Sequence, residues 1–341
     1  GAGIDVSTFY NTDRRQLKVL RQHFNAVSPT FCMKIPQIAG QYGEGKTATV
    51  NFEAADQFVK FARLNNLKIM GHCLINGVLI PKGFFFDTQG NAVSAEVLLE
   101  TIKTHIDSLA GRYKGKIHSW DAANEILDNQ GNYLKNLYYN TLGEDYVKYI
   151  FQFARQADSE ARLYYTDTNL SYPAKREGAL RMLKKLQAEG LKIDGVGFHG
   201  HTRIGKTNFA ELEKSIIAFS ELGLKVSVTE MDVSVLHIIN PDLDTDTLCN
   251  PDFWETLNPY SKSLPKIIAK RLYEDYKTLF RIFIKHSDKI ERVTLWGISD
   301  SESIQNNYPI RGRTDYPLLF DRDYQAKPVV KELINMGKSI K

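Results

Sequence analysis

The sequence has little cysteine and no long apolar run. Its 341 residues include three cysteines, Cys32, Cys73 and Cys249. An odd number of widely spaced cysteines provides neither a disulfide framework nor a CxxC metal motif. Cys32 and Cys73 lie in apolar, strand-like stretches, where cysteine usually packs as a small hydrophobic side chain. No apolar run approaches the roughly 20 residues that a membrane-spanning helix needs, so we expect no membrane span.

A strong charge bias is also absent. Lysine and arginine number 44 and aspartate and glutamate 40, which leaves a net charge of +4. Spread over this length, the excess is too small to indicate a nucleic-acid partner. Hydrophobic residues make up 43 % and charged residues 25 %, which excludes a disordered, collagen-like or coiled-coil chain. No signal peptide is visible at the start of the sequence.

What the sequence does contain is a repeated alternation of short apolar stretches and amphipathic helices. Apolar residues at helical spacing predict helices around Ala55–Ala62, Ala179–Leu186 and Leu272–Phe283. Between the helices we expect strands near residues 2–6, 24–28, 67–75, 117–123, 161–167, 193–199, 225–231 and 292–297. Eight strand–helix alternations without a break in composition predict an α/β fold, a single (β/α)8 TIM barrel spanning residues 1–341.

One connection, residues 234–265, is too long for a simple connector. It is rich in Asn, Asp, Thr and Pro and contains Trp254 and Tyr260. Because it follows the seventh expected strand, it is either a functional loop at the active face or a flexible surface excursion. Residues 242–246 resemble the start of a calcium loop, but the glycine and glutamate of such a loop are missing, which favours a solvated acidic turn.

Two glutamates follow apolar strands directly. Glu125 ends the fourth expected strand and Glu230 the seventh. In a barrel, the carboxyl ends of the strands meet at one face, where the chemistry takes place. Two carboxyl groups that converge there suit glycoside cleavage, since one must donate a proton to the departing oxygen and the other must attack the anomeric carbon. A single glutamate would more simply be an ion-pair partner, but these two are accompanied by Asn, His and Trp at other strand ends.

These residues resemble the motifs of the family 10 glycoside hydrolases, best known as endo-β-1,4-xylanases. The resemblance runs in order along nearly the whole chain. The similar segments are Gly71–His72, Trp120–Glu125 (WDAANE), Tyr165–Asn169 (YTDTN), Gly195–His201 (GVGFHGH), Val228–Asp232 (VTEMD), Val293–Asp300 (VTLWGISD) and Pro317–Asp321 with Lys327–Pro328. The resemblance implies a retaining mechanism on a (β/α)8 barrel, with no metal or organic cofactor.

The resemblance also implies a role for each matching position. Glu125 is expected to be the acid/base and Glu230 the nucleophile. The positions expected to bind substrate are Lys34, His72, Asn76, Asn124, His199, His201 and Trp296, with Asp167 and Asp232 in support. Within this set, His201 would orient Glu230, Asn124 would bind the sugar 2-hydroxyl, and Trp296 would form an apolar wall. The implied partner is a carbohydrate, the implied state a monomer, and the implied location secreted, periplasmic or at the cell surface.

The chain departs from the family pattern at positions that bind the glycone, the sugar on the non-reducing side of the cleaved bond. Thr30 and Phe31 stand where the family has Glu and Asn, although Lys34 is kept. Residues 76–81 read NGVLIP where the family has W-H-S-Q-x-P. His199 replaces a Gln, and Ile304 replaces a second Trp.

Sites built to hydrogen-bond sugar hydroxyls discriminate strongly, because unpaired buried polar groups are costly. We therefore hypothesise a β-glycosidase of altered specificity, whose glycone is less polar or whose cleft is shorter. Two alternatives stay open: an ordinary endo-xylanase that tolerates the changes, and a catalytically inactive carbohydrate-binding barrel.

Overall fold

A computed structural model of the protein describes residues 1–11, 13–38, 50–237 and 251–338. Eight parallel strands form a closed barrel in sequence order, with β1 also pairing with β8. This arrangement confirms the predicted (β/α)8 barrel. The strands are β1 Ala2–Ile4, β2 Ala26–Pro29, β3 Lys68–Asn76, β4 Ser119–Asn124, β5 Arg162–Asp167, β6 Gly195–Arg203, β7 Lys225–Ser234 and β8 Ile290–Leu295.

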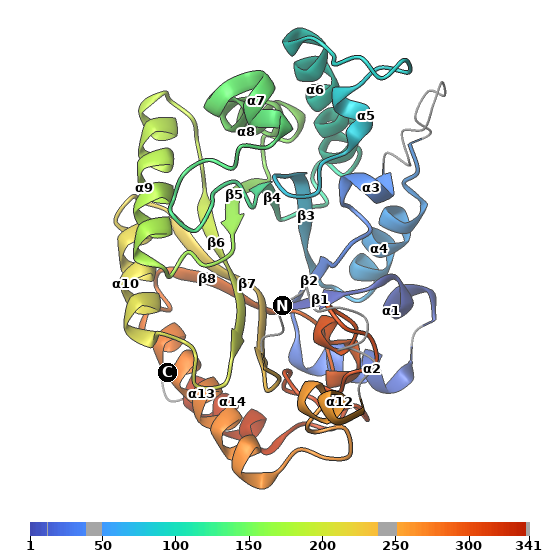
Figure 1. Cartoon of the computed structure of the whole chain (residues 1–341), viewed down its shortest axis with the longest axis vertical. Helices are drawn as coiled ribbons and strands as arrows, with labels where there is room; N and C mark the ends of the chain where they lie inside the picture. Colours follow the sequence, from blue (N-terminus) through green and yellow to red (C-terminus); the bar gives the residue numbers. More distant parts are fainter. Residues whose placement is uncertain (12, 39–49, 238–250, 339–341) are drawn as a thin grey trace.

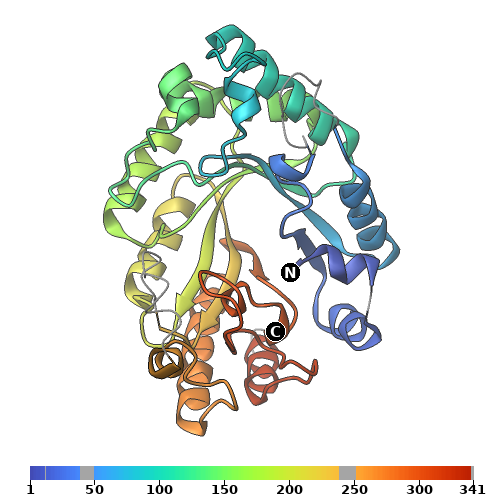
Figure 2. The ribbon, with the colours of Figure 1, turned by 45° about the vertical axis from the view of Figure 1, so that its right-hand side comes forward.

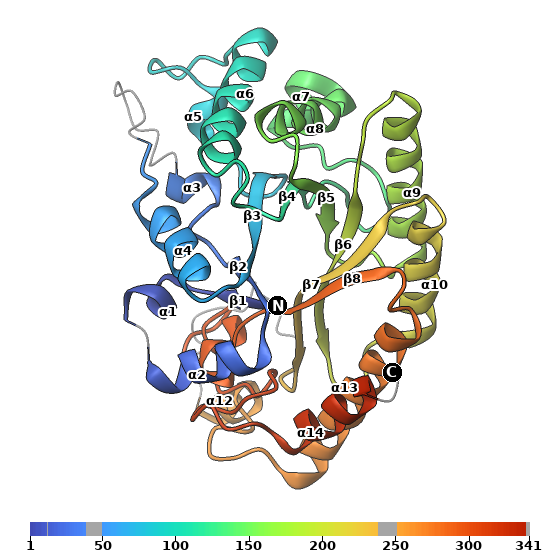
Figure 3. The same cartoon turned by 180° about the vertical axis from the view of Figure 1, so that it is seen from behind.

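The helices follow one another around the strands in chain order (Figures 1 and 2). They are α1 Val6–Tyr10, α2 Arg14–His23, α3 Ile35–Ile38, α4 Glu53–Leu64, α5 Lys82–Phe85, α6 Ala95–Arg112, α7 Leu137–Leu142, α8 Tyr146–Ala157, α9 Pro173–Ala188, α10 Phe209–Ser220, α12 Pro251–Leu257, α13 Lys266–Lys285 and α14 Pro328–Lys338. Short 3-10 turns cover Gly143–Asp145, Asp300–Glu302 and Ile304–Asn306. Views from opposite sides place α14 against α13 (Figures 1 and 3).

The three helices predicted from apolar spacing are α4, α9 and α13. Each buries the expected side chains, for example Phe58 in α4, Leu183 in α9 and Tyr276 in α13. Within the described residues, no helix is long and apolar enough to cross a membrane.

Three strands differ in length from their prediction by two residues or more. The first is shorter, because the Asp5 side chain accepts a hydrogen bond from the backbone N–H of Ser7 and starts α1. The sixth and seventh are longer: β6 and β7 continue to pair beyond an irregularity between His199 and His201, as far as Arg203 and Ser234. The polar sequence of these extensions resembles a loop, yet it continues the barrel wall at the mouth.

The inside of the barrel is closely packed below the site. Trp120 of β4 is fully buried, and a Cβ atom on Gly71 of β3 would lie 2.1 Å from its ring. Only glycine leaves room for the indole there. Trp120 therefore fills the barrel, as a structural residue beneath the mouth.

The predicted long connection is described only in part. The structure describes residues 234–237 and 251–265 of it, including α12. The acidic turn at residues 242–246 and Cys249 lie outside the described residues.

Candidate active site

The two glutamates share an unusual backbone conformation. Glu125 comes directly after β4, and Glu230 lies inside β7 at an irregularity in its pairing with β8. Their φ angles are +56° and +51°, in the left-handed region that residues with a side chain rarely adopt. Such a conformation costs on the order of 1–3 kcal/mol and persists where the surrounding structure enforces it. Asn66, Asn169 and Tyr324 share this conformation, but none of them carries a carboxyl group, so the two strained glutamates mark a candidate site.

The backbone around Glu125 is held by β5. The Glu125 N–H donates to the carbonyl of Thr166 at 2.9 Å. The buried Asp167 carboxylate accepts from the N–H groups of Ile126 and Leu127 at 3.0 and 3.1 Å, and Lys175 pairs with it at 2.7 Å. Asp167 therefore lies one layer behind the site, where it fixes the turn that carries Glu125.

Three histidines surround the carboxylate of Glu230, whose side chain is 10 % exposed. Nε2 of His199 and of His201 each lie 3.3 Å from one of its oxygens, and Nε2 of His72 lies 3.5 Å away. The other ring nitrogen of His201 is 2.9 Å from Asp232. With a carboxylate against both nitrogens, His201 is arranged to donate from each.

These contacts fix the charges around Glu230. Burial alone would raise the pKa of the Glu230 carboxyl, but the charge of His199 and the hydrogen bond from His201 hold it well below its usual range. Burial would lower the pKa of His201, but the Asp232 carboxylate and, to a smaller extent, the Glu230 carboxylate raise this pKa to about 10. At neutral pH the structure therefore holds an ionised Glu230 beside a protonated His201.

Two amides contact the other glutamate. Nδ2 of Asn76 and Nδ2 of Asn124 donate to Oε2 of Glu125 at 2.9 and 3.2 Å. Oδ1 of Asn124 accepts from the Thr166 hydroxyl at 2.6 Å and lies 2.9 Å from Nε2 of His199. Because His199 also faces Glu230, it bridges the surroundings of the two carboxylates.

The sequence interpretation missed one buried pair beneath the site. Asp121 lies 2.9 Å from Nδ1 of His72 and accepts from Arg292 at 3.1 Å. It holds the His72 ring, which meets Trp296 edge-on with 5.4 Å between ring centroids. The signal was present, because an aspartate in the middle of an otherwise apolar strand needs a buried partner.

A cavity of about 560 Å³ opens beside Glu230 and His201. Lys34 and Trp296, both predicted to contact substrate, line it. A Cβ atom on Gly3 would lie 2.7 Å from the Trp296 ring, so glycine lets the indole lie flat against β1. The substituted positions Thr30, Phe31, Leu79 and Ile304 line the same cavity, with Phe31 43 % and Ile304 47 % exposed.

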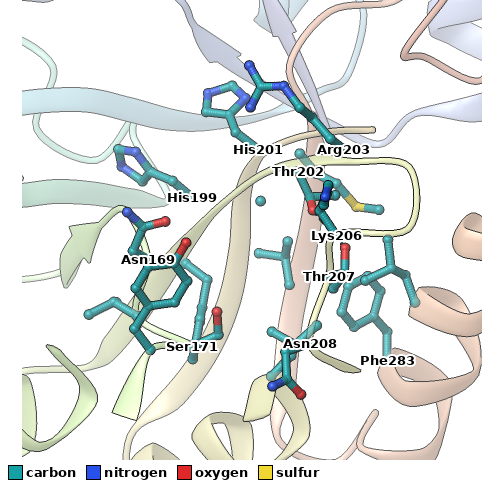
Figure 4. Close-up of a pocket in the computed structure, with 18 residues that line it drawn as sticks. Asn169, Ser171, His199, His201, Thr202, Arg203, Lys206, Thr207, Asn208 and Phe283 are labelled. Atoms are coloured by element: carbon teal, nitrogen blue, oxygen red, sulfur yellow. Dashed lines mark hydrogen bonds between the residues drawn. The ribbon is translucent and has the colours of Figure 1, made fainter. Parts of the chain in front are cut away.

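A second cavity, of about 230 Å³, lies along β6 and also reaches His199 and His201. Figure 4 shows His201 and Arg203 projecting from the strand to one side, while Asn208 and Phe283 lie on the other. Asn169, with a left-handed φ of +55°, lies near His199 in the same view.

Taken together, these contacts place each predicted site residue at, or directly behind, the mouth of the barrel around the two glutamates.

Comparison with known proteins agrees with this geometry. The family model "Glycosyl hydrolase family 10" matches residues 1–336. Endo-1,4-beta-xylanase A of Xylanibacter ruminicola is 37 % identical over 336 residues, which cover 98 % of this chain and 90 % of that protein. Beta-1,4-xylanase of Dictyoglomus thermophilum is 33 % identical over 336 residues, covering 98 % and 87 %.

A solved structure of a GH10 endoxylanase retrieved from a sugarcane soil metagenome superposes with a TM-score of 0.89 at 35 % identity. The match covers 99 % of this chain and 96 % of that one. The family model, the relatives and the shared barrel agree with the motifs at the strand ends. The chain belongs to glycosyl hydrolase family 10 and is a glycoside hydrolase.

Proposed function

We propose that this enzyme cleaves β-linked glycosides with retention, using Glu230 as the nucleophile and Glu125 as the acid/base. The observation that carries the assignment is the contrast between their surroundings. Three histidines keep the buried Glu230 ionised, whereas the donors to Oε2 of Glu125 among the described residues are two neutral amides. An ionised carboxylate suits attack on the anomeric carbon, and a carboxyl that can carry a proton suits the leaving oxygen.

The reaction then runs in two displacements. In the first, Glu230 forms a bond to the anomeric carbon while Glu125 gives its proton to the departing oxygen. In the second, Glu125 takes a proton from water, and the water oxygen displaces Glu230 from the anomeric carbon. The hydrogen bond from protonated His201 helps Glu230 to leave as a carboxylate.

The remaining predicted residues are proposed to position the sugar. His72 and Trp296 are in contact with one another next to Glu230, and Lys34 lines the same cavity as Trp296. Nδ2 of Asn124 carries two hydrogens and donates one to Glu125, so the other is proposed to bind the sugar 2-hydroxyl. His199 is proposed to act by contacting Glu230, and Asp232 by contacting His201.

The substituted positions support an altered glycone preference. Phe31, Leu79 and Ile304 present carbon atoms to the cavity where sugar hydroxyls would need partners. We therefore infer a glycone that is less polar than unsubstituted xylose, for example deoxygenated, acylated or methylated, or a cleft that closes after few sugars. Lys34 and Asn307 are among the polar groups that line the cavity.

One second function has a specific observation in its favour. Relatives at 37 and 33 % identity are named xylanases, so cleavage of plain xylan is the competing assignment. A barrel that only binds carbohydrate is disfavoured by the ion pairing of His201 with both Glu230 and Asp232, which a binding protein has no need to build.

A substrate screen with product analysis tests these assignments. The purified chain is incubated with unsubstituted xylan, acetylated xylan and a set of aryl β-glycosides, with Glu230→Ala as the blank. We expect turnover of substituted or aryl substrates to exceed that of plain xylan. Efficient internal cleavage of unsubstituted xylan would reject the altered specificity. No turnover of any substrate, together with retained carbohydrate binding, would reject the enzyme mechanism.

A further inference from the structure

The turn after β3 is locked by the side chain of Asn76. Asn76 is 3 % exposed, and its Oδ1 accepts from the backbone N–H groups of Val78 and Leu79 at 2.7 and 2.8 Å. Because a carbonyl oxygen must meet these two donors, the amide can be oriented in only one way. Its NH₂ group is then directed at Oε2 of Glu125, 2.9 Å away.

The backbone of the same turn is joined to the segment that carries Glu125. The Gly77 N–H donates to the carbonyl of Asn124 at 2.8 Å, and Nδ2 of Asn136 donates to the carbonyl of Gly77 at 2.8 Å. A Cβ atom on Gly77 would lie 2.1 Å from the carbonyl oxygen of Glu125, so only glycine permits this approach. Asn76 is therefore held in place from both sides.

The two oxygens of Glu125 differ as a result. Oε2 accepts from both Asn76 and Asn124, whereas Oε1 makes no hydrogen bond to any residue that the structure describes. A carboxyl oxygen that already accepts two N–H groups is a poor place for a proton. The proton that Glu125 donates is thus directed to Oε1.

We propose that Asn76 is a positioning residue for the acid/base: it assigns the transferable proton to Oε1 and stabilises the carboxylate left after that proton is given away. This inference rests on the proposed role of Glu125. In the first displacement, the proton moves from Oε1 to the leaving oxygen, and the new charge on the carboxylate is met by two amide donors. In the second, Oε1 takes a proton from water.

The substitution Asn76→Asp tests the donor alone. Aspartate keeps the size of the side chain and the oxygen that the turn requires, but it replaces the NH₂ group with an oxygen that faces Glu125. A like charge there keeps Glu125 protonated to higher pH, by on the order of one pH unit. Asn76→Ser removes the donor without adding charge, since its hydroxyl can hold the turn but is too short to reach Glu125; we expect a smaller shift in the same direction.

Two quantities are measured. The first is the pKa of the Glu125 carboxyl from ¹³C NMR, with its signal identified by its absence from the spectrum of Glu125→Gln. The second is the midpoint of the basic limb of the pH profile of kcat/KM on a phenyl β-glycoside. Asn140→Asp is the matched control, because it makes the same amide-to-carboxylate change at an exposed position of α7, where the side chain donates to the carbonyl of Lys135. We expect both readouts to move to higher pH in Asn76→Asp and to stay in place in the control.

The proposal is wrong if the Glu125 titration and the basic limb have the same midpoints in wild type and in both folded Asn76 variants. Should Asn76→Asp fail to fold, the Asn76→Ser titration decides alone. The proposed function fails separately. If Glu125→Gln retained the full rate on the phenyl substrate, Glu125 would not be the acid, whatever the Asn76 variants do.

Discussion

Nε2 of His199 lies 2.9 Å from Oδ1 of Asn124 and 3.3 Å from Oε1 of Glu230. Oδ1 of Asn124 also accepts from Thr166, and because an amide oxygen can only accept, the histidine nitrogen acts as the donor. One N–H group therefore orients the residue before Glu125 and faces the carboxylate of Glu230. The surroundings of the two proposed catalytic groups are coupled through this contact.

Replacing His199 tests the coupling. In His199→Gln, a neutral amide takes the place of the charge that lowers the pKa of Glu230, so we expect that pKa to rise. The acidic limb of the pH profile of kcat/KM should then move to higher pH, with little change near pH 7. An unchanged acidic limb would show that His199 does not set the charge of Glu230.

Replacing the two glutamates should have different effects on turnover. Glu230→Ala removes the proposed nucleophile, and we expect no measurable turnover of any substrate. Glu125→Ala should slow phenyl glycosides by about 10²–10⁴-fold, the usual contribution of general acid catalysis. It should leave formation of the glycosyl-enzyme from dinitrophenyl glycosides nearly unchanged, because that leaving group needs no proton. Burst kinetics separate the steps, and equal losses on both substrates would contradict the assignment.

The ion pairing of His201 predicts a pH dependence of stability. Its pKa is raised from 6.5 to about 10 in the folded chain, so its contribution is complete below about pH 6.5 and is lost as the pH rises towards 10. Thermal melts from pH 6 to pH 10 should show Tm falling for wild type and a flatter profile for His201→Gln. The partial exposure of His201 reduces the size of the effect. A mutant profile parallel to that of wild type would reject the pairing.

Adding polar groups to the cavity beside Glu230 tests the proposed glycone preference. In the double variant Phe31→Asn with Leu79→Gln, two new amides face the cavity. At roughly 1 kcal/mol for each of the two new hydrogen bonds, we expect KM for unsubstituted xylan to fall about thirtyfold. Lys18→Gln on α2 serves as a surface control. A lower kcat/KM for plain xylan in the double variant would count against the altered specificity.

Gly3 offers a test of the Trp296 wall. Gly3→Ala places a methyl group 2.7 Å from the indole ring, so the ring must leave the position in which it lines the cavity. We expect kcat/KM to fall about tenfold while the barrel stays folded, as judged by circular dichroism. An unchanged kcat/KM would mean that the position of Trp296 is not critical.

The sequence was sufficient for the barrel, because buried parallel strands and amphipathic helices follow local spacing, as Val226–Val228 and Leu272–Phe283 show. It also placed Glu125 and Glu230 at the mouth, since strand order decides which residues meet there. Two features depend on contacts that local patterns do not contain. The paired extensions of β6 and β7 look like polar loops, and the hydrogen bond from Asn76 to Glu125 joins residues 49 positions apart.

The left-handed backbone at Glu125 and Glu230 also has a consequence for the stability of the fold. Glycine, and to a lesser degree asparagine, adopts this conformation more easily than glutamate. If folding stability alone decided the residue type, glycine or asparagine would therefore be favoured at both positions. Glutamate at both positions therefore costs folding stability that glycine or asparagine would not cost, in accord with the role proposed for the two carboxylates.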